Sequence, residues 1–153
     1  MKATAQSTGP DRSLIRKVLV ATDFSPVSNL AVEKAVALAN QCHASLTILH
    51  VININTRGEL GTAAEAMHHL WNDGSSKMGE LAWSLQGQAN TVTVLEEGLP
   101  SEVIAAKSKD FDLLLLGDPG QRKGWRFCSK QTLQGIRENA ACPVMLVRAD
   151  EPN

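Results

Sequence analysis

A run of four leucines that ends in a glycine turn constrains the fold of this chain most strongly. The run occupies residues 113–116, follows Asp112 and leads into Gly117, with a second glycine at Gly120. It is too short for a stable helix and too apolar for an exposed strand, so we expect a central parallel strand covered on both faces. Ligands of open parallel sheets bind just beyond the carboxyl ends of such strands. The glycine turn is therefore the first candidate for a ligand loop.

The composition is that of one globular domain with little net charge. The chain has 153 residues, of which 43% are hydrophobic and 20% charged, and its formal net charge is −1. This near neutrality argues against partners held by electrostatics, so we expect neither nucleic acid nor a membrane surface as a partner. The first apolar run, residues 14–21, is interrupted by two basic residues, which argues against a signal peptide or a membrane span there. We expect a flexible segment over 1–14, a domain over 15–149 and a tail over 150–153, working in the cytoplasm.

Apolar runs and helical periodicities alternate along the chain, which predicts a doubly wound α/β fold. Strands are expected over residues 17–22, 45–52, 91–95, 113–116 and 143–147. Residues 23–26 supply the cap and first turn of one helix, and residues 98–101 begin another. A helix within residues 60–85 is either continuous or broken at Asn72-Asp73-Gly74. The last helix is expected near residues 130–140.

Five short blocks follow one another along most of the chain. They are VLVATDFS at residues 18–25, LTILHV at 46–51, EGLP at 97–100, DLLLLG at 112–117 and ACPVMLV at 141–147. Each block alone is weak, but in this order and spacing the set is specific, and through it the chain resembles the universal stress proteins from residue 17 to residue 148. The resemblance implies an open five-stranded parallel sheet of order 3-2-1-4-5, Rossmann-like and similar to the adenine nucleotide alpha hydrolases. In this order the crevice lies between strands one and four, so Asp23 and Gly117 are expected to face each other.

The resemblance also implies a nucleotide site, which the sequence matches only in its first half. Many members of that family bind ATP through the pattern G-x2-G-x9-G-[ST], whose glycines let backbone amides approach the phosphates at the start of the last helix. Gly117 and Gly120 match the first half, whereas Lys130 and Gln131 replace the second. The side chain of Lys130 obstructs that approach, and Gln131 lacks the compact hydroxyl that can also serve Mg²⁺. We therefore expect conventional binding of ATP with magnesium to be lost or altered.

Basic residues after the glycine turn leave a second interpretation open. Four of them fall within nine residues of one another: Arg122, Lys123, Arg126 and Lys130. Their side chains could contact phosphate in place of the lost amides, which would make the protein a switch that binds ATP or AMP. The plainer interpretation, which we favour, is a solvated basic loop.

Three further residues belong to the candidate nucleotide site. Thr22 and Asp23 follow the first strand, where Asp23 could contact the sugar or base of a nucleotide or could cap the first helix. Val51, near the end of the second strand, would line an adenine pocket, although a strand residue is core by default. The choice between these roles stays open at this stage.

The sequence indicates neither a catalytic site nor a metal site. It contains no P-loop pattern, no G-x-G-x-x-G fingerprint and no Ser-Gly-Gly-x-Asp-Ser loop, and no nucleophile paired with a base stands out. We assign no enzyme activity, while slow nucleotide hydrolysis stays open. His50 lies in a buried strand and His68 and His69 are adjacent on a helix, so no metal geometry emerges. Three cysteines without C-x-x-C spacing are expected to be reduced thiols: Cys42, Cys128 and Cys142.

The last strand is expected to be an edge of the sheet and a dimer interface. Residues 143–147 are apolar on both faces, and no charge precedes Arg148. A second copy that pairs across a two-fold axis would cover this edge, as the family resemblance implies. The expected protein is therefore a homodimeric stress-response or regulatory module with a degenerate ATP motif, whose protein partners the sequence does not identify.

Overall fold

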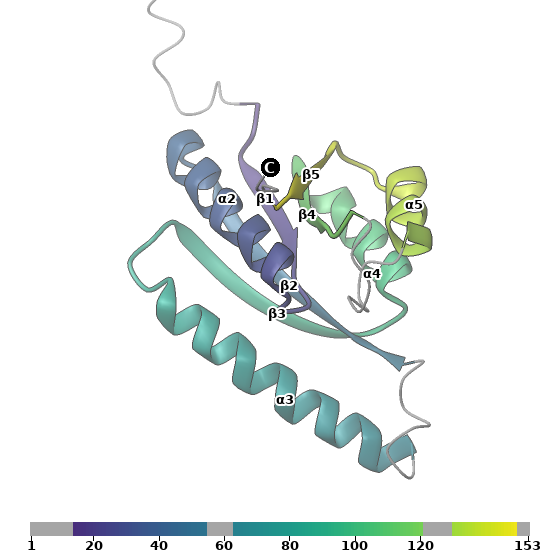
Figure 1. Ribbon diagram of the computed structural model, residues 1–153. Helices are drawn as coiled ribbons and strands as arrows, with labels where there is room; N and C mark the ends of the chain where they lie inside the picture. The colour runs from purple at the N-terminus through teal and green to yellow at the C-terminus, as the bar shows by residue number, and fades with distance from the viewer. Residues whose placement is uncertain (1–13, 55–62, 121–129, 150–153) are drawn as a thin grey trace, which may run out of the picture.

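The computed structural model describes residues 14–54, 63–120 and 130–149 (Figure 1). Within these ranges, five parallel strands form one sheet of order β3-β2-β1-β4-β5. The strands are β1 (Lys17–Ala21), β2 (Ser45–Asn53), β3 (Asn90–Gly98), β4 (Leu113–Asp118) and β5 (Val144–Arg148). The order 3-2-1-4-5 is the one that the family resemblance implied, so the predicted fold class is confirmed.

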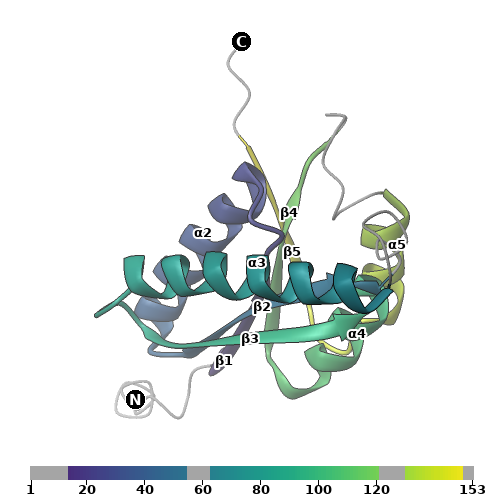
Figure 2. The same ribbon diagram turned by 90° about the horizontal axis from the view of Figure 1, so that it is seen from below.

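Helices cover both faces of the sheet (Figures 1 and 2). Helices α2 (Pro26–Cys42) and α3 (Ala63–Ser84) pack on one face, and α4 (Pro100–Lys107) and α5 (Lys130–Asn139) pack on the other. A short 3-10 helix, η3 (Ser108–Asp110), follows α4. Right-handed crossovers explain the division, because the chain first moves from β1 towards the β3 edge and then returns across the sheet to β4.

Strand β4 is buried between the two helical layers. Leu114, Leu115 and Leu116 are fully buried, and Leu113 is 7% exposed. Alternate side chains of a strand point to opposite faces, so Leu113 and Leu115 join the core beneath α2, while Leu114 and Leu116 join the core beneath α4 and α5. The prediction of a central strand covered on both faces is confirmed.

The start of α2 follows the expected local chemistry with one correction. Pro26 occupies the first turn, and the N-cap is Ser25, whose side chain accepts a hydrogen bond from the backbone N–H of Ser28. Asp23 therefore does not cap the helix, which was one of its two expected roles. It lies two residues before the N-cap, in the loop between β1 and α2.

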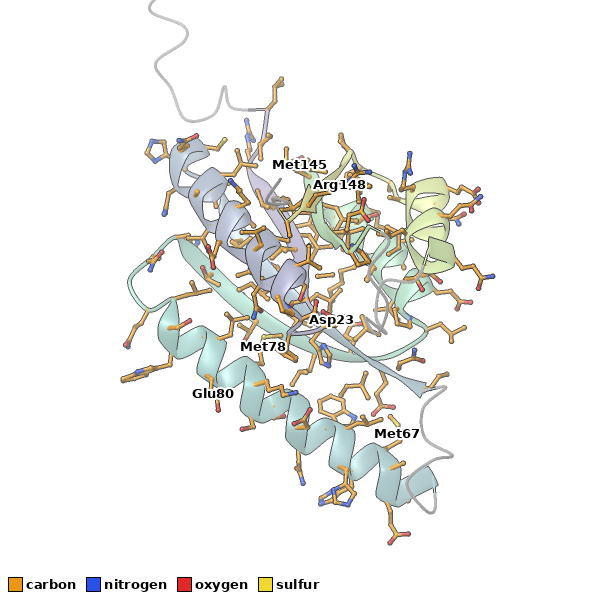
Figure 3. The ribbon with its side chains drawn as sticks, viewed as in Figure 1. Asp23, Met67, Met78, Glu80, Met145 and Arg148 are labelled. Carbon is orange, nitrogen blue, oxygen red and sulfur yellow. The ribbon has the colours of Figure 1, made fainter. Side chains whose placement is uncertain are left out.

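Helix α3 is continuous through Asn72-Asp73-Gly74, so the break left open by the sequence does not occur. Gly74 is buried, and a Cβ placed on it would lie 3.2 Å from Cδ2 of His50 and 3.2 Å from Cδ2 of Leu95. The glycine thus allows the helix to approach β2 and β3 closely. Figure 3 shows Met67 and Met78 on the side of α3 that faces these strands.

The end of β4 meets the first turn of α2 at Gly117. A Cβ placed on Gly117 would lie 2.8 Å from the carbonyl carbon and oxygen of Val27 and 2.9 Å from the backbone nitrogen of Ser28. These neighbours are backbone atoms, so a larger residue could enter only if the helix moved. The first glycine of the turn is therefore required by packing between strand and helix.

We expect Gly117→Ala to lower the free energy of unfolding by about 1–3 kcal/mol, because the added methyl group overpacks this contact. Urea denaturation followed by circular dichroism measures the change. Gly79→Ala is the matched control, since a Cβ at Gly79 meets no heavy atom within 4 Å. Alanine forms helix better than glycine, so the control should gain up to about 1 kcal/mol. Equal stability of Gly117→Ala and the wild type would contradict the packing argument.

Candidate functional site

The candidate site lies where the connections of the sheet diverge. Strand β1 pairs with β2 on one side and with β4 on the other, and the helices that follow β1 and β4 cover opposite faces. Such a switch point opens a crevice at the carboxyl ends of the strands. Thr22 and Asp23 follow β1 at this end, and Gly117 lies near the end of β4. Figure 3 shows Asp23 at the N-terminal end of α2.

A closed cluster of polar side chains shapes the loop between β1 and α2. The hydroxyl of Ser28 donates to Oδ1 of Asp23 at 2.8 Å and lies 3.0 Å from Oγ1 of Thr22. The backbone N–H of Ser25 also donates to Oδ1 of Asp23, at 2.9 Å. Thr22 and Ser28 are buried. Within the described ranges, every buried side-chain nitrogen and oxygen has a hydrogen-bond partner, so these polar atoms are satisfied by the protein itself.

Phe24 adopts an unusual backbone conformation in the same loop. Its φ is 67°, in the left-handed region, where a bulky residue costs about 1–3 kcal/mol. Its backbone N–H donates to Oγ1 of Thr22 at 2.9 Å, and its ring centroid lies 4.6 Å from that of His50. The ammonium of Lys77 lies 5.8 Å from the centre of the Phe24 ring. Contacts from β1, β2 and α3 therefore hold this strained residue in place.

His50 contacts the loop from β2. Its Nδ1 lies 2.8 Å from the backbone carbonyl oxygen of Thr22, and since a carbonyl only accepts, Nδ1 is the donor. Burial lowers the pKa of His50 below the usual value of 6.5 and outweighs the hydrogen bond to Thr22, which raises it. The ring is therefore neutral at pH 7, with its proton on Nδ1.

The glycine turn is tied to the edge strand β5. The backbone N–H of Gly120 donates to Oδ1 of Asp118 at 2.9 Å, while Oδ2 of Asp118 accepts from Nε of Arg148 at 3.1 Å. Gly120 has φ of 66°, and a Cβ placed on it would meet no heavy atom of the described residues within 4 Å. It serves the conformation of the turn, in contrast to Gly117, which serves a packing contact.

The residues predicted to form the nucleotide site lie in different parts of the fold. Gly117 approaches Val27 and Ser28 in the first turn of α2, and Ser28 in turn holds Asp23, so Ser28 connects the end of β4 with the β1–α2 loop. Val51 is buried in the core beneath α4 and α5. Three positions belong to the predicted phosphate loop and its helix: Gln131 is exposed in the first turn of α5, while Arg122 and the side chain of Lys130 lie outside the described residues.

Four side chains of the site were missed by the sequence reasoning, or were given another role. His50 was considered only as a metal ligand, and Ser28, Phe24 and Asp118 were not singled out. The spacing of Ser25 and Ser28 at the start of a helix is a usable signal for the polar cluster. The left-handed conformation of Phe24 leaves no mark in the sequence, because an aromatic residue does not ordinarily adopt it.

The described ranges contain neither a cluster of metal-binding side chains nor a helix that could span a membrane. There, no three His, Cys, Asp or Glu side chains gather in a way that could hold a metal ion. Nor does any helix of these ranges have the length and apolarity needed to cross a bilayer.

The sheet order and the position of the crevice define an open, Rossmann-like α/β domain. The model of the universal stress protein family matches residues 14–148. A relative from Staphylococcus epidermidis that carries the family's name is 30% identical over 143 residues, which span 89% of this chain and 86% of the relative. The chain belongs to the universal stress protein family.

Solved structures show the same fold. The universal stress protein UspA from Lactobacillus plantarum superposes with a TM-score of 0.73 at 22% identity, covering 88% of this chain and 98% of that one. A universal stress protein in complex with cAMP superposes with a TM-score of 0.57 at 18% identity, covering 88% and 97%. At these identities the likeness concerns the fold alone.

We expect Ser28→Ala to lower the free energy of unfolding by about 1–3 kcal/mol, because it removes a buried hydroxyl on which Asp23 and Thr22 depend. The midpoint of urea denaturation reports the change. Ser75→Ala, on an exposed position of α3, is the control and should alter stability by no more than about 0.5 kcal/mol. Similar midpoints for the two variants would show that the cluster does not stabilise the loop.

Proposed function

We propose that the protein is a homodimeric stress-response module, acting in the cytoplasm, whose crevice no longer binds ATP in the usual manner of its family. The observation that carries this proposal is the closed polar cluster at the head of the crevice. Oδ1 of Asp23 already accepts hydrogen bonds from Ser25 and Ser28, and the hydroxyl of Thr22 accepts one from Phe24. A nucleotide that bound Oδ1 of Asp23 or the hydroxyl of Thr22 would compete with bonds that the protein makes with itself.

The glycine turn does not fit the usual ATP pattern either. Gly117 is accounted for by its contact with α2, so its presence is no sign of a phosphate. The N–H of Gly120 is engaged by Asp118. Helix α5 begins at Lys130, where the family pattern has glycine, and continues with the exposed Gln131. The helix start thus has a residue with a side chain where close backbone approach to a triphosphate needs glycine, and an amide where the pattern has a hydroxyl.

Strand β5 supports the dimer. It is an edge of the sheet, with one neighbour, β4, and its residue Met145 is 44% exposed. Figure 3 shows Met145 and Arg148 along this strand, far from α3. An edge without charges before Arg148 invites pairing with another strand, and a second copy across a two-fold axis supplies one. The opposite edge, β3, carries Glu96 and Glu97.

Glu96 and Glu97 on the β3 edge are also bound by side chains of neighbouring helices. Lys107 of α4 forms an ion pair with Glu96, and the indole N–H of Trp71 on α3 donates to Glu97. Side chains from both helical layers therefore reach the carboxyl half of β3. Charged groups are a common means of blocking an edge, so we place the interface at β5.

A second candidate function is a switch that binds ATP or AMP, in which the basic residues from Arg122 to Lys130 contact the phosphates. The neighbour solved in complex with cAMP favours it, since the same fold holds a nucleotide there. Among the described residues, no heavy atom lies within 4 Å of a Cβ placed on Gly120, which would let a ligand approach that turn from their side. The basic residues themselves lie outside the described part of the chain, apart from the backbone of Lys130.

We expect Met145→Glu to convert the dimer to a monomer, because two carboxylates would meet near the two-fold axis. Sedimentation velocity measures the change. Val92→Glu is the matched control: Val92 is 55% exposed on the other edge strand, so the same charge placed there should leave the dimer intact. A dimer that persists in Met145→Glu removes the assignment, and a monomeric Val92→Glu would move the interface to β3.

We expect no binding when phosphate-free protein is titrated with millimolar ATP, ADP or AMP, with and without Mg²⁺, by calorimetry and tryptophan fluorescence. Micromolar binding would instead support the switch. In that case Lys130→Glu should abolish the affinity, while Lys109→Glu, an identical charge change in the 3-10 helix η3, should leave it unchanged.

A further inference from the structure

His50 joins three parts of the fold beneath the β1–α2 loop. Its Nδ1 donates to the carbonyl oxygen of Thr22, and its ring packs against Phe24. Its Cδ2 atom faces α3, where it would lie 3.2 Å from a Cβ placed on Gly74. The backbone N–H of Thr22 donates in turn to the carbonyl oxygen of Leu49, the residue before His50, at 2.9 Å. Thr22, the residue after β1, is thus held by its N–H and by its carbonyl group, and both bonds go to β2.

The second nitrogen of His50 faces the helix. A Cβ on Gly74 would lie 3.6 Å from Nε2, and the side chain of Leu95 on β3 approaches the same position. A proton added to the neutral ring must go to Nε2, because Nδ1 already carries one. Protonation would therefore place a positive charge between β2 and α3, next to a glycine and a leucine.

We propose that His50 is a pH-sensitive latch, which holds the β1–α2 loop in its present conformation while the imidazole is neutral and releases the loop when it becomes charged. Desolvation in the contact with Gly74 disfavours the imidazolium more than the hydrogen bond to Thr22 favours it, so protonation drives the ring out of this contact towards water. Such a movement breaks the hydrogen bond to Thr22 and separates the ring from Phe24. Phe24 then loses one of the contacts that offset its left-handed backbone, so the loop relaxes. His50 is in this sense a positioning residue for the crevice.

Charged groups on the surrounding elements shift the pKa of His50 in opposite directions. Asp23 from the loop and Asp73 from α3 raise the pKa of His50, whereas Lys77 from α3 lowers it. Lys77 and Asp73 are themselves 3.3 Å apart, so each moderates the effect of the other. Burial is the largest influence, and the net pKa lies below 6.5.

Because folding lowers the pKa of His50, the free energy of unfolding decreases at acidic pH. Between the lowered pKa and 6.5 the unfolded chain binds a proton that the folded protein does not, so stability falls as the pH falls through this window. The contribution is fully present above 6.5 and is lost once the pH is below the folded pKa. The latch concerns the loop itself and does not depend on whether the crevice binds a nucleotide.

Amide hydrogen exchange between about pH 8 and about pH 5, corrected for intrinsic rates, tests the latch in the full chain. In the wild type, amides of residues 22–29 should lose protection severalfold as the pH falls. His50→Asn keeps an N–H donor near the position of Nδ1 but cannot titrate, so its protection should be independent of pH in this range. The same variant retains His43, His68 and His69, which controls for their titration. A flat wild-type profile, or an equal pH dependence in His50→Asn, overturns the proposal.

Two variants on α3 test the mechanism without touching His50. Lys77→Met removes the charge that disfavours the imidazolium, so the midpoint of the loss of protection should move to higher pH. Asp73→Asn removes a charge that favours it, so the midpoint should move to lower pH. Both positions are exposed, and their variants should fold. Midpoints that stay in place, or that move in the reverse directions, would also overturn the latch.

Discussion

The close contact between β4 and the start of α2 determines the geometry of the crevice. Strand β4 is buried on both faces, so its carboxyl end cannot move away from the centre of the sheet. Gly117 lets the backbone of this strand approach Val27 and Ser28 within a distance that no side chain would permit. Ser28 then anchors Asp23 and Thr22. The polar loop is therefore positioned by a packing contact between strand and helix.

Half of a ligand motif can persist for reasons of folding. Gly117 matches the first glycine of the family's ATP pattern, but its contact with α2 requires glycine with or without a ligand. Gly120 is required by the left-handed turn, whose N–H is bound by Asp118. Neither residue therefore distinguishes a working nucleotide site from a relic. The positions that would do so are Lys130 and Gln131, and both depart from the pattern.

Strain and burial are concentrated in one loop. Phe24 has a left-handed backbone, and its ring lies against His50, whose own charge is disfavoured by burial. Hydrogen bonds that Thr22 and Asp23 accept from Phe24, Ser25 and Ser28 offset this cost. A loop assembled in this way has a defined conformation but few ways to adapt, which agrees with the proposal that conventional ATP binding is lost.

The sequence by itself determined the buried leucine strand and the region where α2 starts, because hydrophobic runs and a turn with Pro26 are local signals. The sheet order was implied by the resemblance of five blocks to the family. The sequence also located the departure from the ATP pattern at Lys130. Only the tertiary structure decided that α3 is continuous, that Ser25 rather than Asp23 is the cap, and that His50 binds Thr22. The last contact joins residues 28 positions apart, and the Asp118–Arg148 pair spans 30. Such contacts depend on how strands align and how helices approach, which no local pattern encodes.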